Sequence, residues 1–254
     1  MFDKSKIFLN HIRASNSTYS RSNSLLKEIS LDVLDRVDKP EGKSICILDI
    51  WSRSSYIFEA IREKQLKINY IETLSHKNVL SKNKNKIVSS LSLPFKEDSF
   101  DYCFCILSMG SAEEIITTFK KIYDLLKKNG KFICVFHGED HLKEFRDSFL
   151  NFFPHVNENS FCPYIDITSL GKIGNAAGFK NIVIDKNNFY LDVKYASDIW
   201  NFIRNIGDGN ILELRENKYL GKEKFLSFCK KIEEGANNTY YKNTLSYNFF
   251  TATK

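Results

Sequence analysis

The sequence predicts an α/β fold: a doubly wound, mostly parallel, seven-stranded sheet with an antiparallel C-terminal strand and a helical cover. Two observations carry this prediction. Short apolar segments alternate with segments of helical periodicity through the first 140 residues, which is the pattern of strand–helix–strand units. After residue 149 the pattern changes, and an apolar strand returns at the end of the chain. A late return of this kind favours an antiparallel edge pair that closes the sheet.

The first elements follow from spacing. Apolar side chains recur at helical intervals from Leu25 to Val37 and predict a helix over 25–37, which Pro40-Glu41-Gly42 ends. Residues 101–108 (DYCFCILS) are apolar almost throughout, so we expect this strand to be buried on both faces. The other elements expected in this half are a helix at 56–64 and strands at 44–50, 67–73 and 87–89.

A complete helix–strand unit is expected at 111–136. Ser111 and Glu114 have the spacing of a capping box, and an apolar stripe of helical period follows them. Gly130 is expected to stop the helix, and residues 131–136 to form the fifth strand. The remaining expected elements are helices at 166–177, 197–206 and 221–234 and strands at 180–185 and 244–252.

Length and composition favour one domain over residues 1–254. Within it we expect an N-terminal helical segment, a first half that binds a cofactor, and a second half that carries an insertion and covers a substrate. Their bounds are 1–43, 44–140, 141–254 and, for the insertion, about 196–235. No uncharged apolar run reaches the ~18 residues of a membrane span, and no signal peptide is expected.

Charge and cysteine content narrow the class of protein. The net charge of +6 comes from lysines spread along the chain without a nucleic-acid-binding motif, so no nucleic-acid partner is expected. Six cysteines show no zinc-like spacing, and four of them lie in predicted buried strands, which favours free thiols in a reducing compartment. We expect a cytoplasmic protein. Ser-rich, basic residues 4–27 leave a mitochondrial matrix location as the alternative.

The most informative local feature is the end of strand 44–50. This strand ends on the acidic residue Asp49, where a nucleotide-binding α/β protein next places a glycine-rich turn. Here Trp51-Ser52-Arg53-Ser54-Ser55 follows instead. The strand therefore indicates a cofactor enzyme, whereas the loop indicates that the cofactor no longer fits.

A second feature is the pair His137 and His141, which flank Gly138-Glu139-Asp140. Two histidines at this spacing could ligate a metal. No third ligand with suitable spacing is apparent in the sequence, so we interpret them as solvent-facing loop histidines and expect no metal site.

Several segments resemble motifs of the class I S-adenosylmethionine-dependent methyltransferases. Residues 93–101 contain LPF and SFD, as in the segment that leads into the fourth strand of these proteins. Residues 136–146 (FHGEDHLKEFR) resemble FGGDTLYELR, and residues 207–210 (GDGN) resemble GESN. The last two are typical of the branch that contains the malonyl-acyl-carrier-protein O-methyltransferase of biotin synthesis and the complex I assembly factor regarded as an arginine hydroxylase. The resemblance covers almost the whole chain and implies a Rossmann-like methyltransferase fold.

The same resemblance implies a site for S-adenosylmethionine above the carboxyl ends of the first and fourth strands. Asp49 and Glu72 keep the acidic residues that the family places there, Glu72 on the ribose hydroxyls. The loop WSRSSYI lacks every glycine of the family's GCGRGYI, and the acidic residue expected near Ser89 or Ser90 is missing. The candidate cofactor-contacting residues are Asp49, Trp51, Arg53, Ser55, Glu72, Ser90 and Ser108. Because Trp51 replaces a glycine, we expect binding of the cofactor to be weakened or lost.

Two functions follow from this resemblance. The first is an enzyme that transfers a methyl group to an oxygen, nitrogen or carboxylate of a protein or carrier-protein substrate under the 196–235 cover, or a hydroxylase-like variant of it. No catalytic base can be named, because methyl transfer depends mostly on positioning. The second is a non-catalytic descendant that acts as an assembly or scaffold protein. The oligomeric state stays open.

Overall fold

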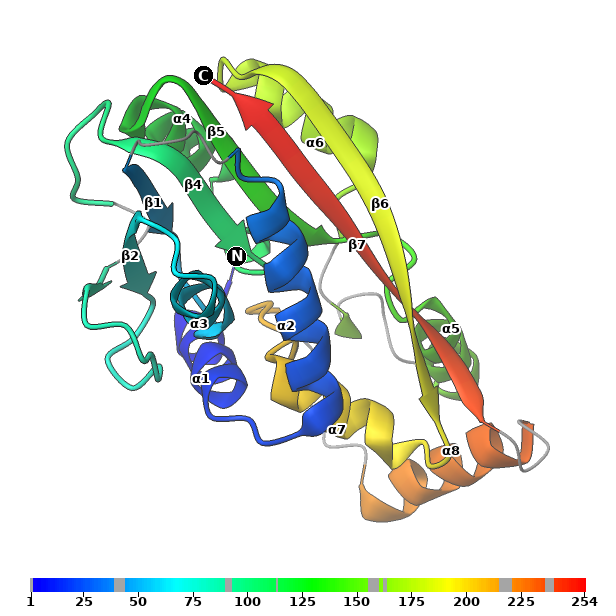
Figure 1. Cartoon of the computed structure of the whole chain (residues 1–254). Helices are drawn as coiled ribbons and strands as arrows, with labels where there is room; N and C mark the ends of the chain where they lie inside the picture. Colours follow the sequence, from blue (N-terminus) through cyan, green and yellow to red (C-terminus); the bar gives the residue numbers. More distant parts are fainter. Residues whose placement is uncertain are drawn as a thin grey trace.

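The computed structural model describes residues 2–38, 44–89, 93–112, 114–154, 160–161, 164–214, 221–235 and 240–254. Its centre is one seven-stranded sheet in the order β3-β2-β1-β4-β5-β7-β6 (Figure 1). Strand β7 runs antiparallel to both β5 and β6, and the remaining neighbouring pairs are parallel. The predicted mostly parallel sheet with an antiparallel C-terminal strand is confirmed.

The elements of the first half lie close to their predicted positions. A strand at the sheet centre needs apolar residues on both faces, and β4 has them: Cys103, Phe104 and Cys105 are fully buried. The observed elements are α2 (Ser20–Asp35), β1 (Ile45–Asp49), α3 (Tyr56–Glu63), β2 (Ile68–Leu74), β3 (Lys86–Val88) and β4 (Phe100–Ile106).

The predicted capping box of the next helix is wrong. Ser111 belongs to a short 3-10 turn, η1 (Met109–Ser111), and Glu114 itself occupies the N-cap position of α4 (Ile115–Leu125). The helix also ends before Gly130, because Leu126 turns extended and pairs with Phe100 at the start of β5 (Leu126–His137). Tertiary pairing of a buried leucine thus overrides a helical pattern in the sequence.

The second half contains one element much longer than predicted. Strand β6 (Lys180–Val193) continues past residue 185, because β7 (Tyr241–Thr253) pairs with it along its length, from Lys180 with Thr253 to Val193 with Tyr241. Pairing along so long a hairpin holds polar residues in the strand that their propensity alone would not. The helices of this half are α5 (Lys143–Phe152), α6 (Ile167–Ala176), α7 (Ser197–Ile206) and α8 (Lys222–Gly235).

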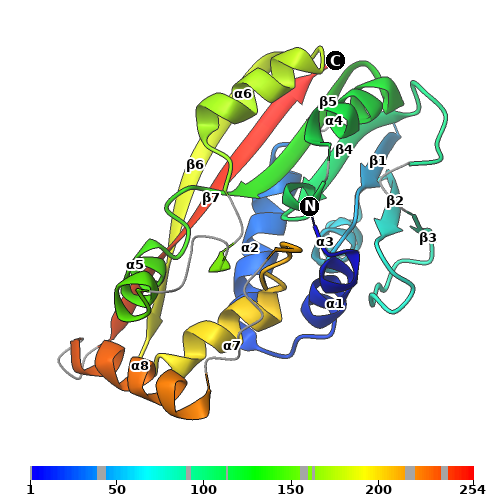
Figure 2. The same ribbon diagram turned by 180° about the vertical axis from the view of Figure 1, so that it is seen from behind.

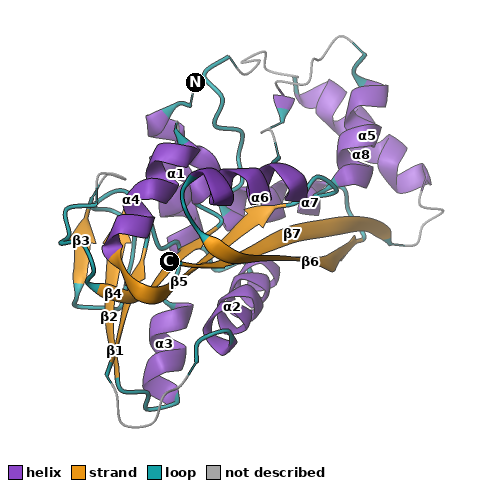
Figure 3. Ribbon diagram, turned by 90° about the horizontal axis from the view of Figure 1, so that it is seen from above, coloured by secondary structure: helices purple, strands orange, loops and turns teal. Residues whose placement is uncertain are grey.

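Helices cover both faces of the sheet, as Figure 3 shows. Helices α2 and α3 lie on one face, and α4 and α6 lie on the other, which faces the reader in Figure 2. Each face has its own core. Ile29 and Phe104 belong to the first core, whereas Phe119 packs edge-on against Phe132 in the second, with ring centroids 5.1 Å apart.

The carboxyl ends of the parallel strands point toward α1 (Lys4–Ser15) and α7 (Figure 1). Sequence periodicity did not predict α1 or α5. Asp3 caps α1, accepting a hydrogen bond from the backbone N–H of Lys6 over 3.1 Å. Phe2 pairs with Leu212, and Asp3 N–H donates to the Ile211 carbonyl, so the N-terminal segment is tied to the chain that follows α7. In the described part of the chain, no helix has both the length and the apolar character that crossing a membrane requires.

Candidate functional site

Two acidic side chains lie at the carboxyl ends of adjacent strands, paired in register: Asp49 on β1 and Glu72 on β2. Both are buried, Asp49 with 2% and Glu72 with 0% of its surface exposed. The hydroxyl of Tyr70 donates to Asp49 Oδ2 over 2.6 Å, while Oδ1 has no hydrogen-bond partner among the described residues. Burial, and then the charge of Glu72, raise the pKa of Asp49 to about 7.

A second layer closes over Glu72. The hydroxyl of Ser81 donates to its Oε2, and the backbone N–H of Lys82 donates to Ser55 Oγ over 3.0 Å. Burial raises the pKa of Glu72, against the lowering effect of Ser81. The segment after β2 therefore folds back over the carboxylate that would receive a ribose. Ser90, also a predicted contact residue, lies outside the described residues.

Trp51 occupies the turn where the family places glycine. Its backbone has φ +52°, in the left-handed region that favours glycine, and only 7% of its surface is exposed. The backbone N–H donates to Thr73 Oγ1 over 2.9 Å, and the indole Nε1 donates to the Ser89 carbonyl over 2.8 Å. The ring of His11 meets the indole edge-on, with centroids 5.7 Å apart. The indole thus spans from the end of β1 to the end of β3 and packs against α1.

Arg53, two residues further on, fills the other side of this loop. Its side chain is 8% exposed and reaches across to the end of α7. The guanidinium donates to Asp208 Oδ1 over 2.9 Å, and also to the Leu107 carbonyl. Further bonds go to Ser108 Oγ and to the carbonyls of Ile206 and Gly207. Loop, strand β4 and helix α7 are therefore joined through one buried cation.

A cavity of about 380 Å³ opens beside Arg53, over the ends of β4 and β5. Its size is in the range of small-molecule pockets. The wall is mostly apolar, and its aromatic part, called the aromatic wall, includes Phe136, Phe145, Phe161, Tyr164 and Trp200. Neither Asp49, Trp51 nor Glu72 lines it. Of the predicted contact residues that the structure describes, only Arg53 lines it, so the cavity and the acidic pair are separate places in the fold.

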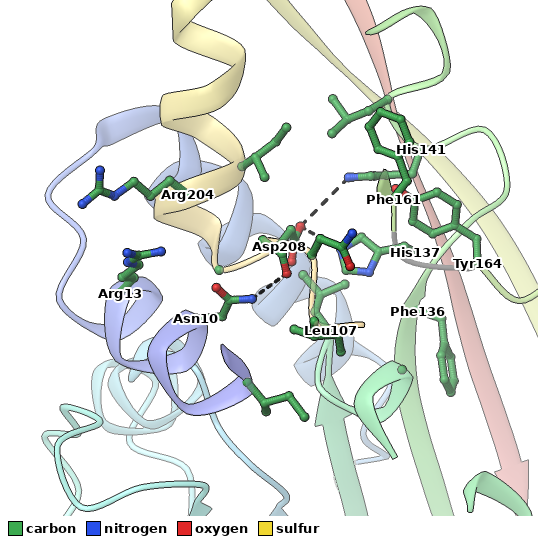
Figure 4. A pocket seen from close by; sticks show the side chains of 18 of the residues that line it. Asn10, Arg13, Leu107, Phe136, His137, His141, Phe161, Tyr164, Arg204 and Asp208 are labelled. Atoms are coloured by element: carbon green, nitrogen blue, oxygen red, sulfur yellow. Dashed lines mark hydrogen bonds and ion pairs between the residues drawn. The ribbon is translucent and has the colours of Figure 1, made fainter. Parts of the chain in front are cut away.

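Three polar side chains form a cluster in the cavity: His137, His141 and Asp208 (Figure 4). His137 Nε2 lies 2.7 Å from Asp208 Oδ2, and His141 Nε2 lies 4.0 Å from the same oxygen. Burial, and then the charge of His137, lower the pKa of His141 to about 3. Burial alone would raise the pKa of Asp208, but His137 and Arg53 hold it below its usual range. The cluster therefore carries a firmly ionised carboxylate beside a neutral imidazole.

The interpretation of both histidines as solvent-facing is wrong for His141, which is 1% exposed. The third polar group that the sequence did not reveal is Asp208, from the segment after α7. The sequence contains a signal for Asp208, because residues 207–210 resemble the GESN motif. Chain distance concealed the contact with His137, since the two residues are 71 positions apart.

Two arginines stand at the edge of the cavity, Arg13 near the end of α1 and Arg204 near the end of α7 (Figure 4). Burial, and then the charge of Arg204, lower the pKa of Arg13. Neither forms an ion pair within the described part of the chain, so their like charges are uncompensated. This edge favours an anionic group next to the aromatic wall.

Comparisons with known proteins agree on the family. A model described as "Methyltransferase domain" matches residues 22–184. The chain is 24% identical over 205 residues to the mitochondrial arginine hydroxylase NDUFAF5 of Danio rerio, covering 75% of this chain and 62% of that protein. It is 21% identical to malonyl-[acyl-carrier protein] O-methyltransferase 1 of Coxiella burnetii, covering 87% of this chain and 78% of that one. The chain thus spans less than two thirds of the zebrafish relative.

Solved structures show the same fold. An S-adenosylmethionine-dependent methyltransferase from Archaeoglobus fulgidus superposes with a TM-score of 0.52 at 15% identity, covering 91% of this chain and 94% of that one. Phosphoethanolamine N-methyltransferase 2 of Haemonchus contortus, solved with S-adenosylhomocysteine, gives a TM-score of 0.52 at 16% identity, covering 89% of this chain and 52% of that one.

Proposed function

Because the chain belongs to the methyltransferase-domain family, we propose that it keeps this family's sheet but works without S-adenosylmethionine, as an assembly or scaffold protein. One observation carries the proposal: side chains of the protein itself fill the cleft above β1, β2 and β3. The indole of Trp51 reaches the Ser89 carbonyl, and the guanidinium of Arg53 reaches Asp208.

The residues present do not fit the cofactor in the family's manner. Glu72 would face ribose hydroxyls, yet it is 0% exposed and Ser81 donates to it. The cofactor's amino-acid tail needs close approach of the backbone, which glycine allows and the side chains of Trp51 and Arg53 obstruct. Asp49 Oδ1 and Glu72 Oε1 are buried and have no hydrogen-bond partner among the described residues. In this proposal they belong to a site that is closed to the cofactor.

The cavity is the binding surface in this proposal. Its aromatic wall would receive an apolar side chain of a partner protein. A neighbouring carboxylate of that partner would bind to Arg13 and Arg204. The names of the relatives support a protein as the molecule bound, since one acts on a carrier protein by its name and the other is named as an arginine hydroxylase. A respiratory complex I precursor in the mitochondrial matrix and an acyl carrier protein in the cytoplasm are accordingly the two partners to test.

The test is calorimetric titration of the purified protein with S-adenosylmethionine and S-adenosylhomocysteine. We expect no binding heat up to millimolar ligand. Trp51→Gly combined with Ser55→Gly reopens the loop, and we expect this double variant to bind S-adenosylmethionine. Trp51→Phe, which keeps a ring in the cleft, is the matched control and should show no binding heat. Micromolar binding by the unaltered protein would refute the proposal.

A methyltransferase is the second candidate, and the retained acidic pair favours it. Asp49 and Glu72 are kept in register at the positions where the family uses them, with one oxygen of each unpartnered. Exposure of both would need movement of the Trp51 side chain and of the segment that carries Ser81. This candidate requires transfer of labelled methyl groups from S-adenosylmethionine to a carrier protein or to a complex I subunit, and that transfer should be lost in Glu72→Gln.

A further inference from the structure

Three potential metal ligands converge in the cavity, two from neighbouring positions in the sequence and one from a distant part of the chain. His137 is the last residue of β5, His141 lies in the turn before α5, and Asp208 follows the end of α7. One ligand atom of each lies within 4.8 Å of the other two (Figure 4). Two imidazoles and one carboxylate form a donor set that suits divalent first-row transition metals.

The strongest observation is the state of His141. Its side chain is buried, yet neither Nδ1 nor Nε2 has a hydrogen-bond partner in the described part of the chain. A buried polar group without a partner costs about 1–3 kcal/mol, so native structures rarely leave one without a reason. The rings of Tyr247 and Tyr164 enclose the imidazole at centroid distances of 5.1 and 5.9 Å. A metal ion bound to one of these nitrogens would accept its lone pair.

The two distances to Asp208 are close to those of an assembled site, and the ligand atoms of the two histidines lie no more than 4.8 Å apart. A metal at about 2.0–2.2 Å from each ligand atom would place those atoms roughly 3.0–3.5 Å apart. The observed separations from Asp208 Oδ2 are 2.7 Å to His137 Nε2 and 4.0 Å to His141 Nε2. The first must lengthen and the second shorten, each by less than about 1 Å, a movement within the reach of side-chain rotation.

The turn that carries His141 is held by several contacts. Gly138 N–H donates to the Ser246 carbonyl over 2.8 Å, and a Cβ on Gly138 would lie 2.5 Å from Ser246 Oγ, so a larger residue here would have to displace that hydroxyl. Leu142, the next residue after His141, has φ +53° and donates its N–H to the Thr244 carbonyl over 2.6 Å. A strained leucine backbone held by β7 is typical of segments that position functional groups.

Among the described residues, Arg146 acts on His141 and Arg53 on Asp208, and the placement of Arg53 is compatible with a metal. Arg53 binds Asp208 through Oδ1, which leaves Oδ2 directed toward the two histidines. A hydrogen-bonded partner on the second oxygen is the usual way in which metal-binding carboxylates are oriented. The remaining charge of Arg53 weakens the attraction for a dication, so moderate rather than very tight affinity is expected.

We propose that His137, His141 and Asp208 bind one divalent transition-metal ion of the Zn²⁺, Fe²⁺ or Co²⁺ class, facing the cavity. Three protein ligands leave a coordination position open toward the aromatic wall, where a bound group could reach the metal. The three ligands lie outside the cleft above β1 and β2, which contacts them through Arg53, and zinc binding is measured separately from S-adenosylmethionine binding.

The test uses untagged, full-length protein treated with chelator. Zn²⁺ is titrated by calorimetry, and Co²⁺ by its visible absorption. We expect one equivalent with micromolar affinity, weakened more than about tenfold in His137→Gln and His141→Gln. His76→Gln is the matched control, because His76 lies outside the cavity, and it should leave binding unchanged. Absent binding, or binding that both ligand variants retain, would overturn the proposal.

A measurement on the unaltered protein covers the case in which a variant fails to fold. X-ray absorption of the Zn²⁺-loaded protein should show scattering from two imidazole rings and an oxygen ligand, without sulfur. A sulfur shell would place the ion on a cysteine instead, and a spectrum without imidazole scattering would equally exclude the cluster.

Discussion

The indole Nε1 of Trp51 donates a hydrogen bond to the backbone carbonyl of Ser89 over 2.8 Å, which ties the loop after β1 to the end of β3. A tryptophan in a left-handed turn needs compensation, and this bond, with the packing of the ring on α1, provides it. Because a large ring is held at this place by its own polar atom, the position of the indole is a stable part of the fold.

Replacing Trp51 by phenylalanine is the first test of that statement. The variant keeps a ring but loses the N–H donor, and we expect the free energy of unfolding to fall by about 1–3 kcal/mol. In Trp51→Gly, loss of the ring should lower the free energy of unfolding by about 3–5 kcal/mol. Glycine relieves the strain of the positive φ, which should restore roughly 1 kcal/mol. Urea unfolding measures both.

Trp200→Phe is the matched control for this prediction. The indole nitrogen of Trp200 is buried and has no partner among the described residues, so removing its N–H should cost less than in Trp51→Phe. If Trp200→Phe proves the more damaging of the two, the Trp51–Ser89 bond does not stabilise the cleft.

A second prediction concerns the buried pair of Arg53 and Asp208. Arg53→Met leaves the buried Asp208 carboxylate without its guanidinium partner and with His137 alone, and we expect a loss of about 3–5 kcal/mol in the free energy of unfolding. Asp208→Asn should also destabilise, while the double variant should recover part of the loss because no unpaired charge remains. Losses that simply add in a double-mutant cycle would show that the two side chains act independently.

How far the sequence predicted this molecule depends on the range of the interactions. The order of strands and helices follows local apolar periodicity, so the sheet and the position of α7 were predictable. The end of α4 was not, because Leu126 pairs with a strand residue distant in the chain. For the same reason the sequence identified Asp49, Trp51 and Arg53 as loop residues but did not predict that Arg53 reaches Asp208.

A third prediction uses the raised pKa of Asp49. An aspartate in an unfolded chain titrates near 3.9, whereas in the folded protein this carboxyl titrates at about 7. Between these values the folded state holds a proton that the unfolded state has released. Stability is therefore fully present below pH ~4 and falls as the pH rises to 7, by at most about 1.4 kcal/mol per pH unit.

Asp49→Asn removes this titration and can still accept the hydrogen bond from Tyr70. We expect the variant to match the original protein near pH 4 and to exceed it at pH 8, by up to about 4 kcal/mol. Unfolding by urea at a series of pH values measures the difference. An unchanged difference across this range would mean that Asp49 is ionised throughout.

The last prediction concerns Gly207, the residue that follows α7 and precedes Asp208. It packs against α1. Its φ is +83°, and a Cβ here would lie 2.7 Å from the Asn10 carbonyl oxygen and 3.1 Å from Ala14 Cβ. Gly207→Ala must therefore both strain the backbone and push α7 away from α1. We expect a loss of about 2 kcal/mol or more in the free energy of unfolding, above the ~1 kcal/mol typical of conformation alone.

Gly171→Ala gives the matched control, because Gly171 lies inside α6 and a Cβ there meets no atom within 4 Å. Alanine should stabilise that helix by about 0.5–1 kcal/mol. The contrast separates a general effect of losing glycine from the specific contact of α7 with α1. Since Gly207 fixes the residue that follows it, its replacement should also displace Asp208 from His137 and lower the affinity for Zn²⁺, whereas Gly171→Ala should leave that affinity unchanged. A Gly207→Ala protein as stable as the original would contradict the close packing of these two helices.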